Sequence, residues 1–161
     1  MKTAQPNSLQ CFVCGVENPV GLHLRFYQTQ PSEVIAEIIV PEKFQGYPGI
    51  VHGGVVAAML DEAAGRSQMG IGEDPRFMFT ARLNIRFRKN VPIGVPLRLV
   101  GTAGETKSRT AEAHGAIYDE NGAVLAEAEA ILVNVPDQIV NKADLEALGW
   151  KVYPESQVMT G

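Results

Sequence analysis

The chain has 161 residues, of which 45% are hydrophobic and 20% charged, a composition that suits one globular domain with a sizeable core. Its formal net charge of −4 argues against a general nucleic-acid-binding protein, which usually carries a basic excess. No apolar run approaches the roughly 18 residues that span a bilayer, and the opening MKTAQPNSLQ lacks the apolar core of a signal peptide. We therefore expect a soluble, cytoplasmic protein that contacts neither nucleic acid nor membrane.

Two cysteines, Cys11 and Cys14, form a C-x2-C pair near the N-terminus. This spacing supplies half of a zinc site or a redox pair. Zinc would need His23 plus another ligand, or ligands from a second chain, because no second cysteine pair exists. A redox pair would open a helix in a βαβ unit, and here a predicted strand follows. We favour a plain structural role for both cysteines.

The remaining pattern predicts two strands, one helix and then four strands. We expect an irregular segment at 1–18, a main domain at 19–136 and a C-terminal extension at 137–161. Alternating apolar residues predict strands at 21–29 and 33–40, before a loop rich in glycine and proline. An apolar helix follows from about 53 to 70. Period-two alternation returns at 77–90, 96–105, 110–119 and 123–135, and 143–149 predicts a short helix. The order favours an α+β fold in which a curled antiparallel sheet of about six strands wraps around one central helix.

Two adjacent carboxylates, Asp61 and Glu62, lie in the middle of this apolar helix. Glu62 has Arg66 four residues later, which predicts an ordinary ion pair on the helix surface. Asp61 has no such partner, because its neighbours three and four residues away are Ala57, Ala58, Ala64 and Gly65. A carboxylate above small side chains indicates either a cavity for substrate and water or a solvent-exposed face.

The helix begins at His52-Gly53-Gly54. Backbone N–H groups at a helix start lack intrahelical partners, and the helix dipole adds positive potential there. Such a terminus can stabilise a developing oxyanion. Glycines at a loop-to-helix junction can equally serve only the backbone conformation.

Gly53 and Asp61 are eight residues apart, which is about 12 Å along a helix axis. A substrate carbonyl and its attacking water must lie about 3 Å from each other and from their catalytic groups. One helix therefore cannot serve one substrate with both groups. Two antiparallel copies can, which predicts a symmetric dimer with two sites at its interface.

The segment VHGGVVAAMLDEA resembles the signature of hotdog-fold acyl-CoA thioesterases of the phenylacetate-pathway type, as do CFVCGVENPVGLHLRF and TARLNIRFRKNVPIG. The resemblance covers about residues 11–135. It implies a hotdog fold and hydrolysis of an acyl-CoA thioester, with no metal and no cofactor beyond the coenzyme A of the substrate. It also implies a homodimer, or a dimer of dimers.

The resemblance further implies roles for individual residues. Asp61 would be general base or nucleophile, the Gly53 amide would bind the thioester oxygen, and His52 would position the substrate. Thr80 matches a hydroxyl residue that aids the water. Gln45 is the candidate for a polar residue upstream of the glycines, where many relatives carry asparagine. The residues that would line the acyl pocket are Phe44, Tyr47, Pro48 and Gly54.

Coenzyme A brings phosphate groups, and two basic clusters could bind them. Arg88 and Lys89 end the group that starts at Arg82, while Lys107 and Arg109 lie in a predicted turn. The alternative is a solvated strand face. For the whole chain two further functions stay open: a non-catalytic binder of acyl-CoA or another apolar ligand, and a hotdog hydratase or dehydratase.

Overall fold

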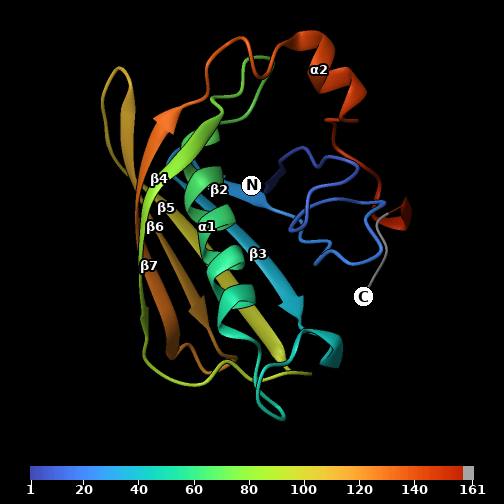
Figure 1. Ribbon diagram of the computed structural model, residues 1–161, viewed down its shortest axis with the longest axis vertical. Coiled ribbons are helices and arrows are strands. Elements are labelled where there is room, and N and C mark those ends of the chain that lie inside the picture. The colour runs from blue at the N-terminus through green and yellow to red at the C-terminus, as the bar shows by residue number, and fades with distance from the viewer. Residues whose placement is uncertain (158–161) are drawn as a thin grey trace.

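The computed structural model describes residues 1–157, apart from the side chains of residues 142 and 143. The sheet has seven strands, all paired antiparallel. It curves around one long helix, α1 (Gly53–Met69), as Figure 1 shows. The strand order is β1-β2-β3-β5-β6-β7-β4. The predicted α+β class is confirmed, with seven strands instead of about six. The strands are β1 (Thr3–Ala4), β2 (Tyr27–Gln30), β3 (Glu33–Ile39), β4 (Met78–Phe87), β5 (Pro96–Thr106), β6 (Thr110–Tyr118) and β7 (Val124–Asn134).

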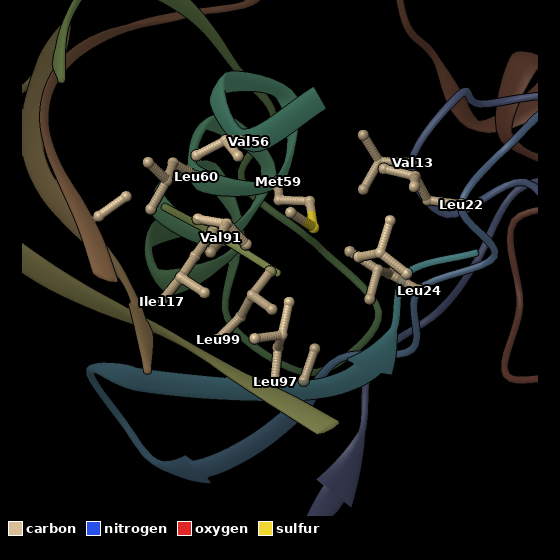
Figure 2. Close-up of a cluster of buried hydrophobic side chains, with 14 of the residues drawn as sticks. Val13, Leu22, Leu24, Val56, Met59, Leu60, Val91, Leu97, Leu99 and Ile117 are labelled. Atoms are coloured by element: carbon tan, nitrogen blue, oxygen red, sulfur yellow. The ribbon is translucent and has the colours of Figure 1, made fainter. Parts of the chain in front are cut away.

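Helix α1 begins and ends where the sequence predicts. His52 caps its N-terminus, and Gly70, with φ of 76°, ends it. Its apolar side packs into the curve of the sheet, where Figure 2 shows its side chains against those of β5 and β6. The fully buried residues of this core include Val56, Met59, Leu60, Ala63, Leu97, Leu99 and Ile117. Burial on this scale, at about 25 cal/mol per Å² of apolar surface, holds the helix in place.

Two glycines set how closely α1 approaches the sheet. A Cβ placed on Gly101 of β5 would lie 1.9 Å from the carbonyl oxygen of Ala63. A Cβ on Gly115 of β6 would lie 2.8 Å from the carbonyl oxygen of Leu60. Both contacts are with helix backbone, which cannot rotate away. The absence of side chains at these two positions therefore lets the helix lie directly on the sheet.

Strand β4 forms one edge of the sheet, and within the described residues it pairs only with β7. Two of its aromatic side chains, Phe79 and Phe87, are 46% and 54% exposed, near the two ends of the strand. Unpaired edges with exposed apolar side chains favour association with another strand. This edge runs beside α1, from Thr80 near the middle of the helix to Phe87 near its start.

The prediction of a strand at 21–29 is wrong over most of this range, because β2 begins only at Tyr27. Leu22, Leu24 and Phe26 are buried, so their alternation correctly marked core residues. The backbone between them does not join the sheet, and His23 has a positive φ of 54°, which no regular strand adopts. The alternation of apolar and polar residues therefore reflects burial of the apolar side chains, although this backbone forms no ladder of strand hydrogen bonds with any described strand.

The N-terminal segment and the segment at 137–157 lie together at one side of α1 (Figure 1). Asn7 pairs with Lys151, and its side-chain amide donates to the carbonyl oxygens of Cys14 at 2.7 Å and Leu24 at 2.8 Å. The predicted short helix is present as α2 (Lys142–Ala147), and two 3-10 turns are η1 (Glu42–Phe44) and η2 (Glu155–Gln157). Residues 158–161 of the C-terminal extension lie outside the described residues. None of the described helices combines the length and apolar character needed to cross a membrane.

Candidate active site

Among the described residues, the carboxylate of Asp61 has no partner on its own helix, but it has one on a neighbouring strand. The hydroxyl of Thr80, on strand β4, donates a hydrogen bond of 2.5 Å to Oδ1 of Asp61. Asp61 is half-buried and Thr80 is exposed. The contact leaves Oδ2 of Asp61 without a hydrogen bond among the described residues, and therefore available to a water molecule.

Asp61 and Thr80 line a cavity of about 440 Å³, which we call the Asp61 cavity. Its floor is the face of α1 that carries Glu62 and Gly65, and its far wall is apolar. The wall is built by the end of α1, the start of β4 and the C-terminal segment, namely Met69, Phe77, Met78, Val140, Leu145, Leu148 and Trp150. A carboxylate beside an apolar hollow is the arrangement expected of a small-molecule site.

At the start of α1, Nδ1 of His52 accepts a hydrogen bond of 2.9 Å from the amide of Gly54. The carbonyl oxygen of His52 accepts from Val55 and Val56. No described group accepts from the amide of Gly53, which is exposed at the positive end of the helix dipole. The cap thus occupies one glycine amide and leaves the other available to a ligand.

His52 and Gly53 line a second cavity of about 620 Å³, the Gly53 cavity. Tyr47, which is 81% exposed, and Phe87 form part of its apolar surface. A Cβ placed on Gly53 would lie 3.7 Å from Cζ of Phe87, an ordinary van der Waals contact. The Asp61 cavity and the Gly53 cavity share no lining residue, so one protomer keeps its two candidate reacting groups apart.

The other predicted site residues are only partly brought together. Gln45 neighbours His52 in the loop, but its Oε1 accepts from the amide of Gly49 at 3.3 Å and so closes the loop. Phe44 packs edge-on against Phe12 and lines a different cavity, beside β3, so it does not join Tyr47. Pro48 and Gly54 are exposed beside the Gly53 cavity.

The two basic clusters lie at opposite ends of α1. Arg88 and Lys89 line the Gly53 cavity at the start of the helix. Lys107 and Arg109 lie in the β5–β6 turn, beside the end of the helix. Arg88 already forms an ion pair of 2.5 Å with Glu127, and Lys107 forms a looser one of 3.5 Å with Glu105. One protomer therefore does not gather these four residues around one phosphate group.

The predicted pair of Glu62 and Arg66 forms, at 2.8 Å, but it is not on the helix surface. Arg66 is only 1% exposed. Its Nη1 donates to the carbonyl oxygen of Pro6 at 2.7 Å, and its guanidinium lies 5.0 Å and 5.2 Å from the rings of Phe26 and Trp150. Burial opposes the charged form of Arg66, yet the carboxylate of Glu62 and the sulfur of Cys14 raise its pKa. Arg66 thereby joins α1 to both ends of the chain.

Cys11 and Cys14 also line the Asp61 cavity. A hydrogen bond from the Cys14 thiol lowers the pKa of Cys11 to about 7, against the opposing effects of burial and of the Glu62 charge. The same hydrogen bond, together with burial, raises the pKa of Cys14. Sequence spacing found the pair, but its approach to Glu62 depends on the tertiary fold.

Several cavity residues were missed by the sequence reasoning. In the sequence, Phe87 is simply one apolar residue of an alternating strand. Its exposure of 54% follows from the position of β4 at the edge of the sheet. Trp150 is the only tryptophan of the chain, which was a usable signal, and Phe77 packs edge-on against it at 5.3 Å. Nothing in the local pattern at 140–150 indicated contact with a helix some 80 positions earlier.

Comparisons with known proteins show what the chain is similar to. The family model described as Thioesterase superfamily matches residues 48–126, which include α1 and the five residues before it. The chain is 30% identical to acyl-coenzyme A thioesterase THEM4 of Rattus norvegicus over 93 residues, or 57% of this chain and 39% of the rat protein. The chain thus spans less than half the length of that relative.

Solved structures extend the comparison to the fold. The crystal structure of RHA08564, a thioesterase superfamily protein, superposes with a TM-score of 0.70 at 28% identity, covering 77% of this chain and 63% of that one. The structure of smu.793 from Streptococcus mutans UA159, bound to acetyl CoA, gives 0.63 at 19% identity, covering 70% and 88%. The chain is thus similar in sequence to thioesterase superfamily proteins, and its fold is the hotdog fold of these structures.

Proposed function

We propose that the protein hydrolyses acyl-CoA thioesters as a symmetric dimer. Asp61 removes a proton from water, and the water oxygen attacks the thioester carbonyl carbon. The Gly53 amide of the second copy donates to the resulting oxyanion. Collapse of the tetrahedral intermediate breaks the carbon–sulfur bond, and the CoA thiolate leaves and takes up a proton. The products are a free acid and CoA.

One observation supports this proposal above the others. The Asp61 carboxylate, with one oxygen held by Thr80, and the unpaired Gly53 amide lie in separate cavities along the same flank of α1 and β4. A second copy in antiparallel orientation would place the Gly53 cavity of one chain against the Asp61 cavity of the other. The unpaired edge of β4, with its exposed Phe79 and Phe87, offers the surface for that association.

The same pairing would bring Arg88 and Lys89 of one copy toward Lys107 and Arg109 of the other, and we propose these residues as contacts for the CoA phosphates. His52 and Gln45 would hold the helix start, while Tyr47 and Phe87 would contact the acyl group. The motif from His52 to Asp61 supports the phenylacetate-pathway type within the superfamily, and therefore small or aromatic acyl groups as first substrates to test.

The test is thiol release from a panel of aromatic, short-chain and medium-chain acyl-CoAs. We expect turnover by the wild type and a loss of about 10²- to 10⁴-fold in kcat for Asp61→Asn, because the variant keeps the shape but removes the base. Asp74→Asn, at an exposed loop position, is the matched control.

Two results would favour the alternatives. Saturable binding of acyl-CoA without thiol release, with equal affinity in Asp61→Asn, would identify a binding protein. Loss of the double bond of a crotonyl thioester without release of thiol would identify a hydratase.

A further inference from the structure

Three potential metal ligands from two distant parts of the chain meet at the wall of the Asp61 cavity. The Sγ atoms of Cys11 and Cys14 and a carboxylate oxygen of Glu62 lie within 4.8 Å of one another. In a tetrahedral zinc site, bonds of about 2.3 Å to sulfur and 2.0–2.2 Å to oxygen place such atoms roughly 3.5–3.8 Å apart. The three atoms would therefore need to close by no more than about 1 Å on binding a cation.

The loop that carries the cysteines is already shaped to hold a thiolate. Sγ of Cys11 accepts hydrogen bonds from the backbone amides of Val13 at 3.4 Å and Cys14 at 3.5 Å. The amide of Gly15 donates to the carbonyl oxygen of Cys11 at 2.8 Å, and a Cβ on Gly15 would lie only 2.4 Å from that oxygen. Amide donors around a metal-bound sulfur orient the ligand and stabilise its negative charge.

A second sulfur contact comes from Ser8. Its Oγ lies 3.8 Å from Sγ of Cys14 and accepts from the amide of Cys11 at 3.3 Å. The hydroxyl can thus donate to Cys14 while it holds the loop closed. Both sulfurs therefore have nearby donors, as ligating thiolates require.

The charges of the cluster fit a divalent cation. Glu62 uses Oε1 for Arg66, which leaves Oε2 without a hydrogen bond among the described residues. Arg66 is buried, and its Nη2 has no hydrogen-bond partner in the described part of the chain. Two thiolates and one carboxylate carry three negative charges, and Arg66 carries one positive charge. A divalent cation would neutralise the remaining two, whereas an uncompensated buried charge is costly.

We propose that Cys11, Cys14 and Glu62 bind one divalent cation of the zinc class, with the fourth coordination position facing the Asp61 cavity. Three protein ligands and one open position are a common zinc arrangement. The cation would tie the N-terminal segment to α1 one residue from Asp61. The sequence lacks a second cysteine pair, and the fold supplies the third ligand from the helix instead.

The test is a metal titration of the reduced, metal-free full chain with Co²⁺, followed by competition with Zn²⁺ against a chromogenic chelator. Because the chain has only two cysteines, a thiolate-to-cobalt charge-transfer band can arise only from this pair. We expect one ion per chain, displacement of Co²⁺ by Zn²⁺ and a higher Tm with Zn²⁺. Cys11→Ser should weaken binding by more than about 100-fold, and Glu62→Gln by at least about 10-fold.

Glu120→Gln, which changes an exposed carboxylate in the β6–β7 turn, is the matched control and should bind as the wild type does. Since Cys14 is buried and its replacement could prevent folding, Cys11 and Glu62 carry the test. The proposal is overturned if reduced wild type gives no thiolate–cobalt band. It is also overturned if Zn²⁺ affinity survives in Cys11→Ser, or if Glu62→Gln binds like Glu120→Gln.

Discussion

The hydroxyl of Thr80 donates a 2.5 Å hydrogen bond to the carboxylate of Asp61 and so links the exposed edge strand β4 to the central helix. The bond holds one carboxylate oxygen and leaves the other open to the Asp61 cavity. In the proposed reaction this orientation determines where the attacking water sits. Thr80 is therefore a positioning residue whose effect passes through Asp61.

Replacing Thr80 tests that role. Thr80→Val keeps the side-chain shape but removes the donor, and we expect kcat to fall about 10-fold, consistent with the loss of one hydrogen bond to a charged group. Thr80→Ser restores the hydroxyl and should recover most of the activity, with KM nearly unchanged in both variants. Equal kcat values for the Val variant and the wild type would show that the bond does not position the base.

The amide of Gly53 can be removed without disturbing the helix. Proline lacks the N–H, yet it is favoured at the first position of a helix, and the dihedral angles of His52 (φ −57°, ψ 134°) suit a residue before proline. We expect Gly53→Pro to lower kcat by about 10²- to 10³-fold, the usual effect of losing one oxyanion donor. Gly53→Ala keeps the amide and is the control. If both variants were impaired equally, the space beside Phe87 would matter and the amide would not.

The close contact between α1 and the sheet predicts strong destabilisation by a single methyl group. Gly101→Ala should lower the free energy of unfolding by about 2–3 kcal/mol, because the added Cβ meets the backbone carbonyl of Ala63. Gly115→Ala, with a longer approach of 2.8 Å to the carbonyl of Leu60, should cost less. Urea denaturation measures both. A Gly101→Ala variant within about 0.5 kcal/mol of the wild type would contradict the observed packing.

Replacing Arg66 should destabilise the protein for a different reason, the loss of a buried ion pair. Arg66→Met removes the partner of Glu62 and the contacts with Pro6, Phe26 and Trp150. We expect a loss of about 3 kcal/mol, at the lower end for breaking a buried ion pair, because Glu62 keeps some contact with water. The fluorescence of Trp150, the only tryptophan, should change in the folded state. Unchanged stability and emission would show that Arg66 does not hold the two chain ends against α1.

The sequence predicted α1 well because its signals are local. Glycines and a histidine mark its start, Gly70 marks its end, and the apolar positions between them fill the core. The four strands β4 to β7 were equally predictable, since alternation and short turns coincide there. Their pairing was not, because β4 lies beside β7 at the edge of the sheet and only β5, β6 and β7 form a meander. The prediction of a strand at 21–29 failed because Leu22, Leu24 and Phe26 are buried although their backbone is irregular. Such a segment shows the same alternation of apolar residues as a half-buried strand.

The parts of the site that the sequence could not predict depend on contacts between distant segments. The sequence shows that Asp61 lacks helical partners, and the family resemblance indicates Thr80 as a hydroxyl residue of the site, but the direct hydrogen bond between these two side chains is seen only in the fold. The spacing of Arg66 and Glu62 predicts an ion pair on the helix surface, and only the packing of the N-terminal and C-terminal segments reveals that Arg66 is buried. Cys11 and Glu62 lie some 50 positions apart in the sequence, so the C-x2-C spacing alone indicated only two of the three potential metal ligands.

The most direct test of the shared site mixes two inactive variants. Differently tagged Asp61→Asn and Gly53→Pro chains are co-expressed, and thiol release is measured on the mixture and on purified mixed dimers. Each mixed dimer holds one site with Gly53 from one chain and Asp61 from the other, both intact. We predict about half of the wild-type activity per mixed dimer, and about a quarter for a random 1:1 mixture. Mixed dimers that are no more active than either parent would contradict the account, because the two groups would then act within one chain.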